Sequence, residues 1–181
     1  MNERLHNLVL RIADLEGAHV GRGPHHPTDP DPILEPRIRL LLEHYPALGQ
    51  DRDYVDFLLT YAGASVLPGQ LMSFDIRGFT EQSAPLPETE EEFVEEAEYL
   101  RNGFFVFAQG CYATGPGEVA MKLYADYFAF DIKVGGGSGV FRRRTTEVDL
   151  DARYVWHKAG FLDWLEEAVG MGCYYEFAPI R

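Results

Sequence analysis

The chain has 181 residues, of which 46% are hydrophobic and 13% aromatic, and this length and composition favour one folded domain over residues 1–181 rather than a disordered chain. The 29 acidic and 16 basic residues give a net charge of −13, so the field of the protein repels nucleic-acid phosphates and anionic lipid surfaces. The longest apolar run, residues 104–108, is far shorter than the ~20 residues that a membrane span needs.

The start of the chain and its two cysteines predict the cellular compartment of the protein. Residues 1–16 carry charges throughout and lack the apolar stretch of a secretory signal. Cys111 and Cys173 form no CxxC motif. We therefore expect a cytoplasmic protein with reduced thiols, although the sequence alone leaves a disulfide between the two cysteines open.

Apolar residues that recur every three or four positions predict helices in the first third of the chain. The first helix has the stripe Leu5, Leu8, Val9, Ile12 and Leu15. Residues 17–32 are rich in Gly and Pro and predict a loop. A second helix begins near Glu35 and Pro36, with the stripe Ile38, Leu41, Leu42 and Tyr45. Asp51 suits the N-cap of a third helix, with the stripe Tyr54, Phe57, Leu58 and Tyr61.

After one or two short strands within residues 65–79, residues 87–103 predict a helix with a broad acidic face. Thr89 and Glu92 have the spacing of a capping box, and Phe93, Val94, Ala97 and Leu100 form a narrow apolar stripe. The face consists of Glu91, Glu92, Glu95, Glu96 and Glu98. It is either a solvated face that aids solubility or a surface for a partner.

The second half of the chain predicts strands and one closing helix. Residues 104–108 indicate a buried strand, and residues 119–134 alternate in their second half, with Phe128, Phe130, Ile132 and Val134 on one face. The glycine-rich residues 135–139 join this strand to a partner at 140–148, and 154–156 form another strand. A helix follows, with the stripe Phe161, Trp164, Leu165 and Ala168. Helices, then antiparallel strands, then a helix is the order of an α+β fold.

Three patterns resemble the SUKH superfamily, the Smi/Knr-type proteins, over residues 33–170: YVDFLLTYAGA (54–64), FFVFAQGCYATGPGEVAMKLYADYFAFDI (104–132) and VWHKAGFLDWL (155–165). The family's usual Gly-Asp pair is Gly117-Glu118 in this chain, and residues 1–32 match nothing in the family. The resemblance implies a twisted antiparallel sheet flanked by helices. It also implies an immunity protein that binds and neutralises a cognate toxin, with no catalytic residues.

Other patterns carry weaker chemical hypotheses. The residues His19, His25, His26, Asp29 and Asp31 are competent metal ligands, but their spacing follows no ligand pattern, so we expect no metal and no cofactor. Cys111, with His157 or His44 as base, has no signature of a nucleophile around it. The basic run 142–144 alternates faces on a strand, so we expect cross-strand pairs with Asp or Glu rather than a phosphate site.

We therefore expect a non-enzymatic protein that occludes the active surface of a basic toxin, such as a nuclease. The acidic face would steer the encounter and a few aromatic side chains would hold the complex. The expected contact residues are Glu91, Glu92, Glu95, Glu96, Glu98, Tyr124 and Tyr127. The alternatives are a housekeeping adaptor of the same fold and a small metal-dependent hydrolase that uses the histidine-rich loop.

Overall fold

The computed structural model describes residues 2–20, 38–39, 41–43, 45–61, 63–69, 72–76, 103–114, 122–146 and 153–173. The helices are α1 (Glu3–Ala13), the 3-10 helix η1 (Pro46–Gln50), α3 (Arg52–Tyr61) and α5 (Phe161–Gly170), and residues 38–39 and 41–43 are also helical. The strands are β1 (Ala18–Val20), β2 (Ala64–Gly69), β3 (Met72–Ile76), β4 (Phe104–Thr114), β5 (Lys122–Asp131), β6 (Val140–Thr146) and β7 (Val155–Lys158). Within these ranges, every helix is too short or too polar to cross a bilayer.

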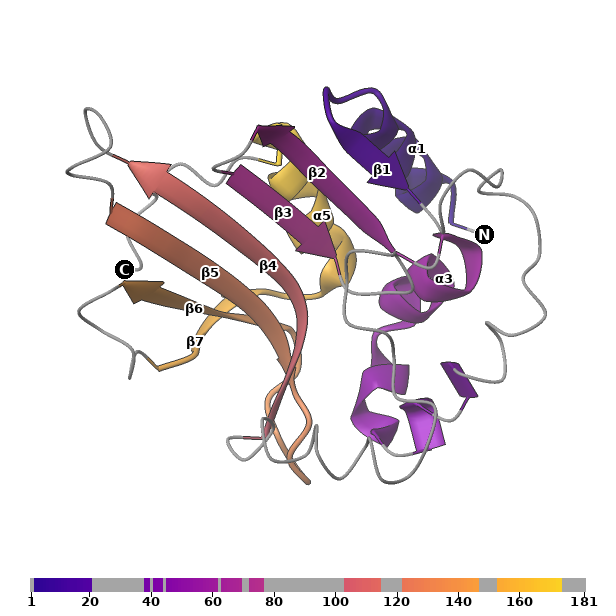
Figure 1. The fold of residues 1–181 in the computed structure, drawn as a ribbon. Coiled ribbons are helices and arrows are strands. Elements are labelled where there is room, and N and C mark those ends of the chain that lie inside the picture. Colours follow the sequence, from indigo (N-terminus) through magenta and orange to yellow (C-terminus); the bar gives the residue numbers. More distant parts are fainter. Residues whose placement is uncertain are drawn as a thin grey trace.

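The described strands form one antiparallel sheet in which each strand pairs with the next along the chain. β1 and β7 are its edges, and the long strands β4 and β5 curve through its middle (Figure 1). The predicted α+β fold, a twisted antiparallel sheet flanked by helices with a helix after the last strand, is confirmed.

The helices pack on one face of the sheet through a cluster of aromatic rings. On α5, the ring centroid of Trp164 lies 4.9 Å from that of Phe107 and 5.3 Å from that of Phe128. On α3, the ring centroid of Tyr54 lies 5.0 Å from that of Phe130. All five side chains are buried, and the predicted docking of the last helix on the strand of Phe128 and Phe130 is confirmed.

The apolar stripes predicted for the described helices also face this core. The buried members are Leu5, Leu8, Val9 and Ile12 in α1, Ile38 and Leu41 in the segment before η1, Tyr54, Phe57, Leu58 and Tyr61 in α3, and Phe161, Trp164, Leu165 and Ala168 in α5. Leu15, Leu42 and Tyr45 are partly buried against it. The predicted acidic helix, residues 87–103, lies outside the described residues apart from Gly103.

One carboxylate joins the two helices that carry the aromatic cluster. Asp51, predicted as an N-cap, accepts the backbone N–H of Tyr54 at 3.1 Å through Oδ1 and that of Phe161 at 2.7 Å through Oδ2. It therefore caps both α3 and α5, and Gly160, the N-cap position of α5, has no side chain to do so. Burial raises the pKa of Asp51, although both N–H donors favour its charged form.

The prediction of a loop over residues 17–32 is wrong for its first residues. Ala18–Val20 form β1, which pairs antiparallel with residues 64–66 of β2. Three residues are too few to show a periodic pattern, and it is the pairing with β2 that satisfies their backbone groups and makes them a strand. Residues 21–32 lie outside the described part.

The prediction that Val134 shares a face with Phe128 is also wrong. β5 ends at Asp131, and Val134 is fully exposed in the hairpin loop that follows. The physical reason is a carboxylate: Asp131 accepts the backbone N–H groups of Lys133 and Gly137, each at 3.1 Å, and so bends the chain away from the strand. The predicted hairpin between the two strands is confirmed.

Replacing Trp164 with Ala should lower the free energy of unfolding by about 3–5 kcal/mol, the usual cost of truncating a large aromatic in a core. Urea denaturation followed by circular dichroism measures this change. The matched control is Trp156→Ala, at the exposed tryptophan of β7, which should cost about 0.5 kcal/mol. A loss below about 1 kcal/mol for Trp164→Ala would show that α5 is not docked on the sheet.

Replacing Asp51 with Ala should lower the free energy of unfolding by about 1–4 kcal/mol, because the change removes two helix caps that each contribute about 0.5–2 kcal/mol. The same denaturation experiment measures it. Asp14→Ala, at an exposed aspartate after α1, removes an equal charge and is the control. Equal losses in the two variants would contradict the double-cap interpretation.

Candidate functional site

Antiparallel pairing determines which side chains share the face of the sheet that is turned away from the helices. Residues directly opposite each other lie on one face, and successive residues alternate. Because Phe128 faces the helices, its neighbours on β5 face away, together with their partners on β6. We call this side the outer face. Its described members include Phe104, Val106, Gln109, Tyr127, Ala129, Phe141, Arg143, Tyr154 and Trp156.

A row of rings and cations crosses the outer face. Nζ of Lys133 lies 4.3 Å from the ring centroid of Phe104, which stacks on Tyr154 with 4.4 Å between centroids. The guanidinium carbon of Arg143 lies 5.3 Å from the ring of Tyr154 and 5.0 Å from that of Tyr127. We name these five residues the outer-face ladder. A cation over a ring contributes about 0.5–1 kcal/mol at such a surface.

A small residue lets the aromatic layer continue from β4 to β6. Ala129 on β5 lies on the outer face and is nevertheless fully buried, while the rings of Phe104 and Phe141 on the two flanking strands lie 5.3 Å apart. Trp156 lies opposite Phe141 on the edge strand, and 60% of its surface is exposed. The layer therefore ends at an accessible indole.

The helix side of the same strands carries a buried cluster of three charges. Asp126 accepts two hydrogen bonds from Arg142, at 3.1 and 3.0 Å, and two from Arg144, at 2.9 and 2.8 Å. Asp126 and Arg142 are almost completely buried. The predicted cross-strand pairing of the basic run is confirmed for these two arginines, whose forked bonds hold β6 against β5.

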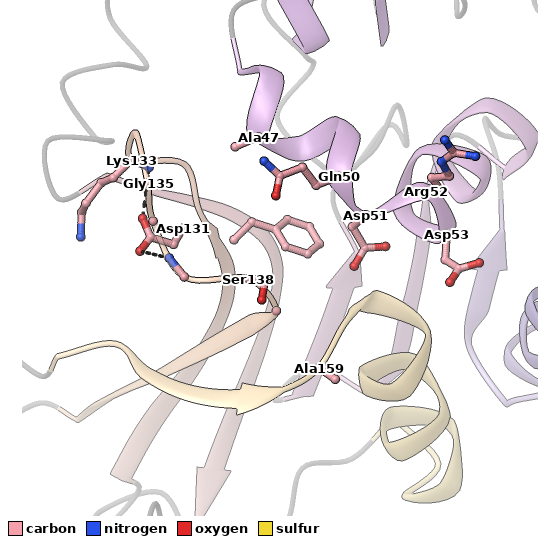
Figure 2. Close-up of a pocket in the computed structure, with 14 residues that line it drawn as sticks. Ala47, Gln50, Asp51, Arg52, Asp53, Asp131, Lys133, Gly135, Ser138 and Ala159 are labelled. Atoms are coloured by element: carbon pink, nitrogen blue, oxygen red, sulfur yellow. Dashed lines mark hydrogen bonds between the residues drawn. The ribbon is translucent and has the colours of Figure 1, made fainter.

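A cleft of about 420 Å³ lies between the start of α3 and the hairpin loop 135–139 (Figure 2). Its three carboxylates already have structural partners: Asp131 binds the loop, Asp51 caps two helices, and Asp53 accepts Nδ2 of Asn2 at 2.7 Å. Gly136 leaves room for Asp131, since a Cβ at that position would lie 2.6 Å from its carboxylate. The carboxylates of the cleft thus stabilise the hairpin turn and the helix ends. The outer face is therefore the stronger candidate site.

Of the contact residues predicted from sequence, Tyr127 lies in the outer-face ladder. Tyr124 lies on β5 opposite Thr146 of β6, and its side chain is outside the described part. The five predicted glutamates, Glu91, Glu92, Glu95, Glu96 and Glu98, are also outside it.

The structure describes only some of the residues on which the enzyme hypothesis depends. His19 lies in β1, and His25, His26, Asp29 and Asp31 are outside the described residues. Cys111 pairs with Ala125 on β5, whereas the ring of His157 contacts Phe128, about 10 Å further along that strand.

Burial shifts the pKa values of both His157 and Cys173, and His157 also contacts a carboxylate. Nε2 of His157 lies 2.7 Å from Oε2 of Glu167, and burial lowers the pKa of His157 against the opposing effect of that carboxylate. Cys173 is a free thiol, and burial raises its pKa to about 12. A thiol with so high a pKa is a poor nucleophile at neutral pH.

Sequence reasoning predicted Tyr127 alone among the five ladder residues as a contact residue, and it missed Lys133, Phe104, Tyr154 and Arg143 as well as the neighbouring Trp156. Arg143 was expected to pair with a carboxylate, but the alternation that turns Arg142 and Arg144 toward Asp126 turns Arg143 to the tyrosines. Trp156 was predicted only as part of a strand. Its exposure follows from its place on the outer face of the edge strand β7, which no local pattern shows.

Comparisons with models of protein families, with curated proteins and with solved structures found no match to this chain.

The two faces of β6 should respond differently to mutation. Asp126→Ala leaves two arginines without their shared carboxylate on the helix side, and should lower the free energy of unfolding by about 3–5 kcal/mol. Arg143→Met on the outer face keeps most of the aliphatic stem and should cost at most about 2 kcal/mol, the loss of two cation–ring contacts. Urea denaturation of both variants tests this, and a greater loss for Arg143→Met would contradict it.

Proposed function

We propose that the chain is a non-enzymatic cytoplasmic binding protein of the SUKH immunity type, which neutralises a basic toxin by covering its active surface. The observation that carries the proposal is the outer-face ladder with the exposed Trp156 beside it. Trp, Tyr and Arg are the side chains that dominate binding energy in protein interfaces.

The ladder is suited to binding because its side chains are already held in place. Phe104 stacks on Tyr154 and packs edge-on against Phe141, so these rings lose little freedom when a partner covers them. Phe104 and Phe141 lie on strands that are paired on both sides, which restrains the backbone beneath them. A rigid aromatic surface loses less affinity to side-chain ordering than a mobile loop does.

The charge of the protein supports a basic partner. A net charge of −13 attracts a cationic surface over long range and raises the rate of encounter. An acidic chain also presents a nuclease with the sign of charge that its nucleic-acid substrate carries. The predicted glutamates between residues 91 and 98 would add to this steering through their charge.

The direct test is co-expression with the neighbouring open reading frame, which the proposal expects to encode the toxin and to stop growth when expressed alone. The wild-type chain should restore growth, and the double variant Tyr154→Ala/Trp156→Ala should lose at least about 90% of that protection, because it removes two aromatic anchors from the outer face. Surface-plasmon measurements on the purified pair should show a dissociation constant raised by about tenfold or more.

The matched control is the double variant Leu10→Ala/Leu59→Ala, which removes two exposed apolar side chains from α1 and α3. It should protect like wild type, and circular dichroism verifies that both variants are folded. Full protection by the folded Tyr154→Ala/Trp156→Ala variant would exclude the outer face as the toxin-binding surface.

A further inference from the structure

Arg143 stands apart from the two arginines beside it on β6. Arg142 and Arg144 each make forked hydrogen bonds to Asp126. Arg143 has no carboxylate within ion-pair distance in the described part of the chain, and its buried Nε has no hydrogen-bond partner there. A cation that is partly removed from water without an anion is costly, and a bound anion would offset that cost.

The surroundings of Arg143 hold the guanidinium in place. Tyr127 on β5 and Tyr154 before β7 lie on either side of β6, and both rings are within 5.3 Å of the guanidinium carbon. Two flanking rings restrict the long side chain without using its N–H donors. The planar group therefore offers the forked donors of its two Nη atoms, rather than the buried Nε, to a ligand with little further ordering.

We infer that Arg143 binds a carboxylate of the protein partner, an Asp or Glu side chain or a chain terminus, on the outer face between Tyr127 and Tyr154. A carboxylate matches the forked guanidinium with two parallel hydrogen bonds. The rings of the ladder and Trp156 would accept apolar residues next to that carboxylate.

The net charge of the protein favours a carboxylate over a phosphate as the ligand of Arg143. The guanidinium geometry suits both groups. A phosphomonoester carries nearly two negative charges at neutral pH, and a protein of net charge −13 repels it more strongly than a single carboxylate. The aromatic walls also favour a ligand that is apolar on both sides of one charge.

This inference rests on the proposed function and makes it more specific. A partner that is basic as a whole is steered by the net charge, and at the contact it presents one acidic group to Arg143. In the long-range attraction this chain supplies the negative charge, whereas in the local pair it supplies the positive charge of Arg143. Mutation can therefore remove one interaction without the other.

The test is selection of random twelve-residue peptides displayed on phage against the purified full chain. Wild type should enrich peptides in which one Asp, Glu or terminal carboxylate lies next to apolar or aromatic residues. Synthetic copies should bind Arg143→Met about tenfold or more weakly than wild type, because a buried charge pair at an interface has lost one partner. Arg143→Lys keeps the charge without the fork and should bind with intermediate affinity.

Arg11→Met is the matched control, because it removes an exposed arginine from α1 and should leave peptide affinity unchanged. The inference is overturned if no peptides are enriched, if they show no acidic preference, if Arg143→Met binds them equally well, or if inorganic phosphate displaces them where acetate does not. If acidic peptides depend on Arg143 but the toxin assay shows no protection, the inference survives and the proposed function fails.

Discussion

The docking of α3 and α5 on one face of the sheet determines what the other face displays. Tyr54 and Trp164 cover Phe107, Phe128 and Phe130, and all five rings are buried in the described core. Because side chains alternate along a strand, fixing one set of residues against the helices turns the next set outward. The outer-face ladder is therefore a consequence of the same pairing register that builds the core.

Residues 142–144 show this constraint within one strand. Two arginines point to the helix side and bind one buried carboxylate, and the arginine between them lies among tyrosines. The first pair is structural and restrains β5 and β6. The middle residue contributes little to the core, which leaves its donors for a ligand. Identical side chains at consecutive positions thus have different roles.

Much of the fold was predictable from sequence because its signals are local. The stripe of α3, the cap at Asp51 and the hairpin around residues 135–139 each follow from spacing or turn chemistry, and each is confirmed. The strand at Ala18–Val20 was missed because only its pairing with β2 makes it a strand. Val134 was misplaced because the bend after β5 depends on a side-chain bond of Asp131.

The candidate site was only partly predictable, for a related reason. Tyr127 was expected in the contact surface, but the ladder joins residues from β4, β5, β6 and the segment before β7, and no sequence pattern brings these together. The second cap of Asp51 was equally hidden, because Phe161, whose N–H it accepts, is 110 residues further along the chain. Alternation predicts which residues share a strand face, whereas contacts between strands require the register.

The fluorescence of Trp156 tests the central claim, that the outer face is the contact surface, most directly. The chain has two tryptophans: Trp164 is fully buried, and 60% of Trp156 is exposed. Acrylamide is neutral, so the negative charge of the protein does not bias its access. If the toxin partner covers the outer face, its binding should sharply reduce acrylamide quenching of Trp156 and shift its emission to the blue. Trp156→Phe should abolish both changes, with a tryptophan-free variant of the partner used throughout. Unchanged quenching of Trp156 in a saturated complex would contradict the account.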